Sequence, residues 1–165
     1  MRKWLLLTLA TAMLLPRIGL AHAEGLHRFV RGSWEEIRRT HAGRPTVVHF
    51  WGLTCAPCRV EMPRWGELLS KRADLNLVTI HADLVLGEPA AVAATLRRVG
   101  LARAENWTFN DRFIERLRYE IDPQWQGQIP LTILMSPDGT TTTIEGVADQ
   151  EAIRAWLDDQ VRARR

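Results

Sequence analysis

The sequence has little of what marks several other classes of protein. Only two of its 165 residues are cysteine, so no network of disulfide bridges can support the fold. No internal repeat or low-complexity linker appears along the chain. The largely apolar run near the N-terminus, residues 4–15, has twelve residues, whereas a membrane-spanning helix needs about 20. These deficits argue against a disulfide-rich module, a repeat array and a transmembrane anchor.

Net charge is also missing once the N-terminal segment is set aside. The formal charge is +3 at pH 7, and residues 1–23 contain Arg2, Lys3 and Arg17 but no acidic residue. The remaining 142 residues are therefore neutral overall, and the positive charge that favours nucleic-acid binding is lacking. The full sequence, with 46% hydrophobic and 25% charged residues, has the composition of a globular protein, and 142 residues suit one domain.

The first 23 residues have the three parts of an export signal. A basic start is followed by the apolar run and by a polar stretch that ends Ala21-His22-Ala23. We predict a signal peptide over residues 1–23, cleavage after Ala23, one domain over residues 24–165 and a periplasmic location. An uncleaved membrane anchor facing the periplasm is the alternative. No cysteine lies near the cleavage site, which excludes attachment of a lipid there.

The two cysteines, Cys55 and Cys58, are separated by only Ala56 and Pro57. A bridge between them closes so small a loop that it constrains the unfolded chain little. A β-rich apolar run over residues 45–51 predicts a buried strand, which a short Gly-containing segment ends. Apolar residues then recur at helical spacing: Val60, Met62, Trp65, Leu68 and Leu69. Cys55 is thus expected at the exposed start of a helix, and Cys58 one turn inside.

This placement predicts different roles for the two sulfurs. The helix N-terminus favours a thiolate at Cys55, which makes it the nucleophile, and Cys58 then resolves the mixed disulfide. A structural zinc site would need two more ligands, but His27, His41, His49 and His81 lack the short spacing of such sites. Copper(I) could use two thiolates alone, so a copper(I) chaperone stays open. No metal and no cofactor beyond the Cys55–Cys58 couple is expected.

The rest of the chain predicts alternating strands and helices. Ser33 and Glu36 form a capping box that should open a helix reaching Gly43, and Pro89 and Gly100 should bound another. Residues 101–128 are ambiguous: residues 107–109 are a candidate for a short strand, and Asn110 is a candidate cap of a helix. Further strands are expected over residues 26–31, 75–82, 131–135 and 140–145, and a last helix carries Ile153, Trp156, Leu157 and Val161.

Two motifs carry a resemblance to a known family. One is Phe50-Trp51-Gly52-x-x-Cys55-x-x-Cys58-x-x-Glu61-x-Pro63, and the other is Gln128-Ile129-Pro130 ahead of a strand. Over roughly residues 26–163 the chain resembles the thioredoxin-fold, TlpA/ResA-like exported thiol–disulfide oxidoreductases. The resemblance implies an α/β, thioredoxin-like fold with a central mixed β-sheet flanked by helices.

The resemblance also implies roles for residues around the cysteines. Pro130 should follow a cis peptide bond and face the cysteines, which leaves the Ile129 backbone free to pair with substrate beside Cys55. Trp51 and Pro57 should belong to the same substrate-binding surface. Gly146 resembles the family's glycine in a loop near the cysteines.

The sequence departs from the thioredoxin pattern at two positions, and the first of them bears on proton handling. Thioredoxins carry a buried Asp six residues before the first cysteine, and this chain has His49 there. Glu61 matches an acidic position of the TlpA/ResA-like group, so either Glu61 or His49 could accept the proton of Cys58. Each could instead be structural, Glu61 as a solvated helix carboxylate and His49 as a hydrogen-bonded core imidazole. Thioredoxins also carry a tryptophan where this chain has Thr54, which implies a different substrate surface.

The dipeptide between the cysteines bears on the direction of electron flow. Ala56 and Pro57 offer no charge, whereas DsbA-type oxidants carry a histidine that stabilises the thiolate. We therefore expect a monomeric reductase that acts on protein disulfides and is re-reduced by a membrane electron donor. A role as a cytochrome c maturation reductase is a secondary hypothesis, because residues 125–130 match the Gly-rich segment of those enzymes poorly.

Overall fold

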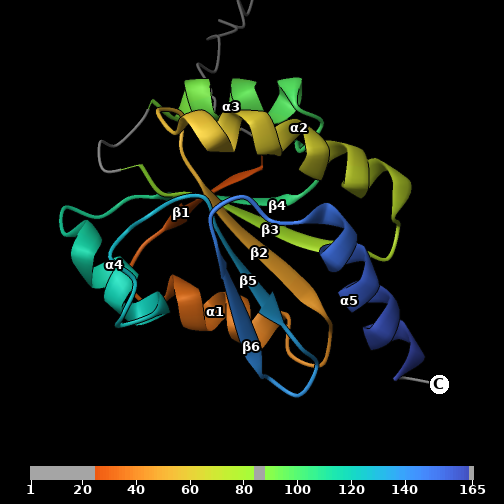
Figure 1. Cartoon of the computed structure of the whole chain (residues 1–165). Coiled ribbons are helices and arrows are strands. Elements are labelled where there is room, and N and C mark those ends of the chain that lie inside the picture. Colours follow the sequence, from red (N-terminus) through yellow and green to blue (C-terminus); the bar gives the residue numbers. More distant parts are fainter. Residues whose placement is uncertain (1–24, 84–87, 164–165) are drawn as a thin grey trace, which may run out of the picture.

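A six-stranded sheet forms the centre of the protein (Figure 1). The structure is a computed structural model, and it describes residues 25–83 and 88–163. The strands are β1 (Leu26–Phe29), β2 (Thr46–Trp51), β3 (Asn76–His81), β4 (Glu105–Phe109), β5 (Leu131–Met135) and β6 (Thr141–Glu145). The helices are α1 (Ser33–Thr40), α2 (Ala56–Lys71), α3 (Pro89–Arg98), α4 (Ile114–Ile121) and α5 (Gln150–Arg162).

The sheet is mixed, and its strands lie in the order β1-β4-β3-β2-β5-β6. β1, β4, β3 and β2 pair in parallel, whereas β5 pairs antiparallel with both β2 and β6. Every residue of β2 is buried, because it has a strand on each side and helices on both faces. This arrangement confirms the expected fold class.

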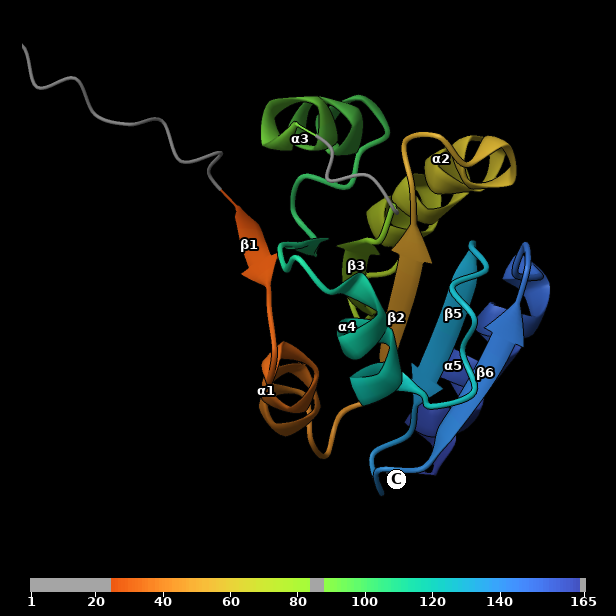
Figure 2. The ribbon, with the colours of Figure 1, turned by 90° about the vertical axis from the view of Figure 1, so that its left-hand side faces the viewer.

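Helices cover both faces of the sheet, and alternate residues of β2 face different layers. Val48 and Phe50 pack with residues of α1 and α4, while Val47 and Trp51 pack with α2, α3 and α5. Figure 2 shows α4 in front of the sheet and α5 behind it. The period-two alternation of a strand accounts for this division of the core into two layers.

Most expected elements are present, including the hairpin of β5 and β6 and the strand and helix of the ambiguous region. The capping box is wrong: Gly32, at φ 84°, is the N-cap of α1, and the Ser33 hydroxyl accepts from the Val30 N–H at 3.0 Å. Asn110 is also not a helix cap. Phe113 precedes α4, and the Asn110 side chain accepts from Arg28.

Not every apolar residue that recurs at helical spacing is buried. Val60 is 61% exposed, while Met62, Trp65, Leu68 and Leu69 of the same helix are buried as predicted. No helix within residues 25–83 and 88–163 is long and apolar enough to cross a membrane. The predicted signal peptide, residues 1–23, lies outside the described residues.

Candidate redox site

A disulfide joins Cys55 and Cys58 at the N-terminus of α2. Cys55 is the N-cap residue with an extended backbone, and the helix begins at Ala56, as the strand, break and helix pattern predicted. Cys58 is fully buried, whereas Cys55 is partly exposed and is followed by the exposed residues Ala56 and Pro57. Only Cys55 therefore presents its sulfur to the surroundings.

The start of α2 favours negative charge on Cys55. The Cys58 N–H points to the Cys55 sulfur at 3.2 Å, and the first turn of the helix contains no acidic residue. The unpaired N–H groups at a helix N-terminus and the helix dipole stabilise an anion placed there. After reduction of the disulfide, the same contacts stabilise the Cys55 thiolate over the thiol.

The segment before β5 approaches the disulfide. The Ile129–Pro130 bond is cis, and the Ile129 carbonyl oxygen lies 3.6 Å from the Cys55 sulfur. The Gly146 N–H donates to the Pro130 carbonyl oxygen at 2.9 Å, which ties this segment to the end of β6. The fold thus brings Ile129 beside Cys55, although 74 residues separate them in sequence.

Glu61 lies one turn beyond Cys58 on α2 and is fully buried. Its Oε1 atom accepts from the Trp65 indole N–H and the Ala148 backbone N–H, each at 3.0 Å. Burial raises the pKa of the carboxyl, and this outweighs the lowering by the two hydrogen bonds and by the charge of Arg64. Oε2 has no partner among the described residues, so it is free to accept a proton.

His49 lies in β2 and is fully buried as well. Its Nδ1 atom lies 3.0 Å from the Thr132 hydroxyl, and its ring lies 5.1 Å from that of Trp65. Burial lowers the pKa of the imidazole to about 3, because a charged ring would have no solvent around it. His49 is therefore neutral at physiological pH.

Pro57 and Trp51, the other two residues predicted to contact substrate, differ in their exposure. Pro57 is exposed in the first turn of α2. Trp51 is only 1% exposed, and its ring packs edge-on against that of His81 at 5.2 Å. The indole of Trp51 thus belongs to the core and not to the exposed surface around Cys55.

The sequence reasoning missed Asp83, which holds the loop between β2 and Cys55. Its carboxylate accepts from the backbone N–H of Leu53 at 2.7 Å, and from the backbone N–H and hydroxyl of Thr54 at 3.2 and 2.9 Å. His81 Nε2 lies 3.2 Å from the same carboxylate. A Cβ at Gly52 would overlap with Asp83, so glycine allows this close approach.

One signal in the sequence could have pointed to Asp83. It lies two residues beyond the end of β3, and β3 runs parallel beside β2. The carboxyl ends of neighbouring parallel strands meet at one edge of a sheet, which is where such folds place their functional groups. An aspartate at the end of β3 was therefore bound to lie near the loop that follows β2.

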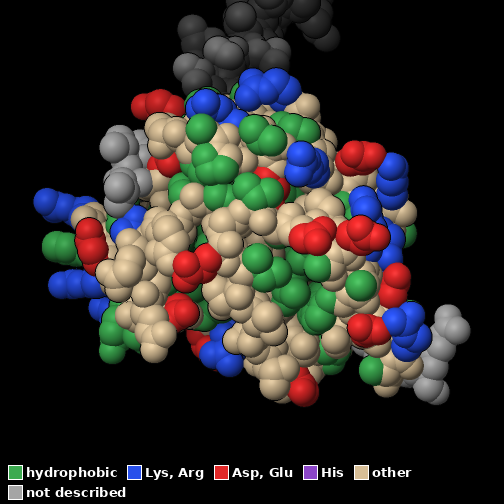
Figure 3. Space-filling view, in the orientation of Figure 1, with side chains coloured by type: hydrophobic (Ala, Val, Ile, Leu, Met, Phe, Trp, Pro, Cys, Tyr) green, Lys and Arg blue, Asp and Glu red, His purple; other side chains and the backbone are tan. Residues whose placement is uncertain are grey.

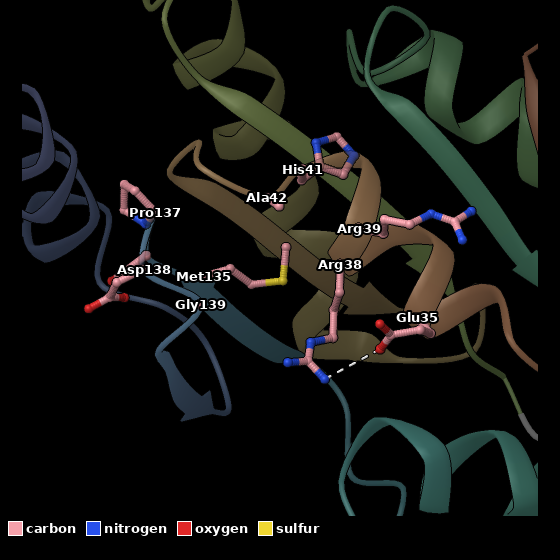
Figure 4. A pocket seen from close by; sticks show the side chains of 10 residues that line it. Glu35, Arg38, Arg39, His41, Ala42, Met135, Pro137, Asp138 and Gly139 are labelled. Carbon is pink, nitrogen blue, oxygen red and sulfur yellow. Dashed lines mark hydrogen bonds and ion pairs between the residues drawn. The ribbon is translucent and has the colours of Figure 1, made fainter.

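A cavity lined by α1 and the turn between β5 and β6 is less suited to chemistry than the surroundings of the disulfide (Figure 4). Glu35 and Arg38 on its wall pair with each other. His41 uses both ring nitrogens, with Glu105 on Nε2 and with Arg44 and Asn76 on Nδ1. Within residues 25–83 and 88–163, moreover, no three His, Cys, Asp or Glu residues are grouped as a metal site would require.

Solved structures similar to this one share its architecture. A secreted disulfide oxidoreductase of Mycobacterium tuberculosis, described as homologous to E. coli DsbE, matches with a TM-score of 0.58 and 19% identity, over 73% of this chain and 85% of that one. StoA from Bacillus subtilis matches with a TM-score of 0.53 and 21% identity, over 70% and 83%. This chain has the thioredoxin fold. Within the thioredoxin fold, the Cys55–Cys58 pair lies at the start of α2.

The sequence comparison is local. The thiol–disulfide oxidoreductase YkuV of Bacillus subtilis is 41% identical over 39 residues, which is 23% of this chain and 26% of YkuV. The match thus spans about a quarter of that relative's length. No protein-family model matches the chain.

Proposed function

We propose that this protein exchanges disulfides with other proteins through Cys55 and Cys58, and that it acts as a reductase. The observation that carries the proposal is the asymmetry of the pair: a disulfide at a helix N-terminus with Cys55 partly exposed and Cys58 buried. A substrate can reach one sulfur only, so the other is reserved for the internal step. The similar structures, which include a disulfide oxidoreductase, support this activity.

The reaction starts from the reduced protein. The Cys55 thiolate attacks one sulfur of a substrate disulfide, forms a mixed disulfide and releases the other substrate sulfur as a thiolate. Cys58 then loses its proton and attacks the Cys55 sulfur, which releases the second substrate sulfur. The products are a substrate dithiol and the Cys55–Cys58 disulfide that the structure contains. Two electrons from a donor, expected in the membrane, restore the dithiol.

Glu61 is the better candidate for accepting the proton of Cys58. Its raised pKa brings the carboxylate closer to the pKa of a thiol, and its free Oε2 lies in the buried layer that contains Cys58. His49, with a pKa of about 3, is too weak a base for this role. His49 instead supports the core between β2 and α2 through its contact with Trp65.

The reductive direction is supported by what surrounds Cys55. Neither Ala56 nor Pro57 carries a charge that would lower its pKa further. A thiolate that is less strongly stabilised favours the disulfide form of the protein and hence donation of electrons to substrates. The reduction potential of the couple, measured in glutathione or dithiothreitol buffers, should lie nearer that of thioredoxin than that of DsbA.

Trapping of partners tests the proposal. Cys58→Ser leaves the attacking thiol and removes the resolving one, so covalent complexes should accumulate at least about tenfold over wild type. Cys55→Ser should form few, although Cys58 remains. Both variants are expressed with their leader and compared by non-reducing electrophoresis, with mass spectrometry of the shifted bands.

Other outcomes of the trapping experiment have definite meanings. If neither variant traps a partner and wild type does not reduce protein disulfides, the proposal is wrong. A copper(I) chaperone would instead lose metal to a similar extent in both variants, because each has lost one of two thiolate ligands. Apocytochromes among the trapped partners would make cytochrome c maturation the leading biological role.

A further inference from the structure

A cavity of about 350 Å³ lies between α2 and α3, beside the loop that precedes Cys55. Its wall is mostly apolar and includes the buried side chains of Trp51 and Met62 and the partly buried Leu53 and Val99. The volume is at the lower end of the range for ligand pockets, which suits a single bulky side chain. Ile129 does not line the cavity, so the cavity is separate from the backbone contact on Cys55.

Two guanidinium groups lie at the exposed edge of this cavity, from Arg59 on α2 and Arg98 on α3. Arg59 donates to the Leu53 carbonyl at 3.4 Å, and Arg98 donates to the Thr95 hydroxyl at 3.2 Å. Neither makes an ion pair with a carboxylate of residues 25–83 or 88–163. Figure 3 shows apolar and basic side chains side by side in the region where Figure 1 draws α2 and α3.

A third observation concerns the cavity wall. The indole N–H of Trp51 is buried and has no acceptor in the described part of the chain. A buried donor without a partner is rare in folded proteins. This N–H has almost no accessible surface, so the features that face a ligand are the apolar wall and the two cations without a carboxylate partner, which together suit an apolar group that carries an acid.

The cavity is placed to receive part of a substrate protein. Leu53 lies two residues before Cys55 and Arg59 four residues after it, so both sides of the nucleophile contribute to the cavity. We propose that it binds a bulky apolar side chain of the partner, with a neighbouring Asp or Glu paired to Arg59 and Arg98. This proposal rests on the proposed function, because a mixed disulfide on Cys55 is what brings a polypeptide there.

The test measures binding without thiol chemistry. The oxidised wild-type protein is titrated with acetyl-Leu-Asp-amide, and the NMR signals of the Trp51 indole and the Met62 methyl group are followed. Saturable shifts at both residues are expected. Acetyl-Leu-Asn-amide should bind about two- to fivefold more weakly, the effect of one exposed ion pair. Acetyl-Ala-Asp-amide should bind about tenfold more weakly, because less apolar surface is buried.

A pair of neighbouring arginines provides a matched control. Arg98→Gln should weaken the preference for the Asp peptide over the Asn peptide, and Arg98→Gln combined with Arg59→Gln should abolish it, because both cations of the cavity edge are then gone. Arg97→Gln removes the same charge from the same helix, but Arg97 does not line the cavity, so the preference should persist. The ratio of two peptides in one variant cancels any general effect of the substitution on the protein. A preference that survives the double substitution, or that Arg97→Gln weakens as much as Arg98→Gln does, overturns the proposal.

Other occupants give different results. If 4-methylpentanoate binds as tightly as the dipeptide, the cavity takes small amphipathic acids and the peptide proposal is wrong. If the Trp51 and Met62 signals shift on dilution without ligand, a second copy of the chain fills the cavity, and the proposal is also wrong. Absence of any saturable shift likewise overturns it. Because oxidised protein is used, a positive titration stands even if trapping fails, and the reverse holds too.

Discussion

Burial shifts the pKa values of Glu61 and His49 in opposite directions. It raises that of the carboxyl and lowers that of the imidazole, because in both cases the neutral form needs less solvation. The consequence for proton transfer differs between the two. A carboxylate with a raised pKa is a stronger base, whereas an imidazole with a pKa of about 3 is a weaker one.

Glu61→Gln should therefore slow the attack of Cys58 on the mixed disulfide by about a hundredfold, the lower end of what a general base contributes. The glutamine oxygen can still accept from Trp65 and Ala148, so the fold around it should be kept. Stopped-flow decay of a mixed disulfide on Cys55 measures the step. Alkylation of Cys55 by iodoacetamide should change by less than about twofold, because Glu61 does not act on that sulfur.

His49→Gln is the matched variant for Glu61→Gln, since it changes the other buried candidate. Its rate of resolution should stay within about twofold of wild type, because an imidazole with a pKa of about 3 is too weak a base to take the proton of Cys58. A slow step in His49→Gln together with a normal one in Glu61→Gln would exchange the two roles. Normal rates in both would leave neither residue with the role.

His49 should also make the protein sensitive to acid. The folded protein holds the ring neutral down to about pH 3, whereas the unfolded chain binds a proton below about pH 6.5. Stability from this group is complete above pH 6.5 and is lost as pH falls, by about 1.4 kcal/mol per unit. Urea unfolding of wild type and His49→Gln between pH 7 and pH 4 measures the difference. Parallel curves would show that His49 does not titrate in this way.

At the scale of elements, α2 and α3 approach each other through Gly66. A Cβ at this position would overlap with the carbonyl oxygen of Val99, at the end of α3. Helix propensity alone predicts that Gly66→Ala stabilises α2 by about 1 kcal/mol. The contact with Val99 makes the expected effect of Gly66→Ala on stability unfavourable, because backbone atoms cannot move aside as a flexible side chain can.

Gly66→Ala should lower the free energy of unfolding by about 1–3 kcal/mol, the usual cost of overpacking. Denaturant unfolding gives the value. Ala94→Gly, at an exposed position of α3, is the control for propensity and should cost about 1 kcal/mol. If Gly66→Ala instead raises stability, the two helices do not meet as closely as the structure has them.

Local patterns in the sequence predicted most of these elements. Pro89 and Gly100 bound α3 as expected, and the turn over residues 136–139 joins β5 to β6, since these signals act within a few residues. Ser33 was misassigned for a comparable reason. Gly32 adopts a left-handed conformation, and the Val30 N–H donates to the Ser33 hydroxyl. Because this local hydrogen bond uses the hydroxyl, Ser33 does not form the capping box.

The site was predictable where its chemistry is local and was missed where distant segments meet. The redox pair can be predicted from the four consecutive residues 55–58. The unequal exposure of Cys55 and Cys58 can be predicted from their position at the start of a helix. The hydrogen bond from the Thr54 N–H to Asp83 joins residues 29 apart in sequence. The hydrogen bond from the Ala148 N–H to Glu61 joins residues 87 apart. Only the sheet order and the packing of α2 against the end of β6 bring such partners together.

At the scale of the whole molecule, the described fold begins close to the predicted cleavage site. β1 is an edge strand that begins at Leu26, three residues after Ala23. Cleavage after Ala23 would therefore leave β1 complete, with its full pairing to β4. An export signal that ended later in the chain would remove part of the sheet.

We expect the exported protein to begin at Glu24. The apolar run is too short to span a bilayer, and Ala21 and Ala23 are the small residues that a signal peptidase needs before the cut. N-terminal sequencing and the intact mass of protein from the exported fraction measure the cut. Ala23→Leu should retain the leader, because the larger side chain does not suit the position before the bond. Wild-type protein with Met1 intact in a membrane pellet would show instead that the leader serves as an anchor.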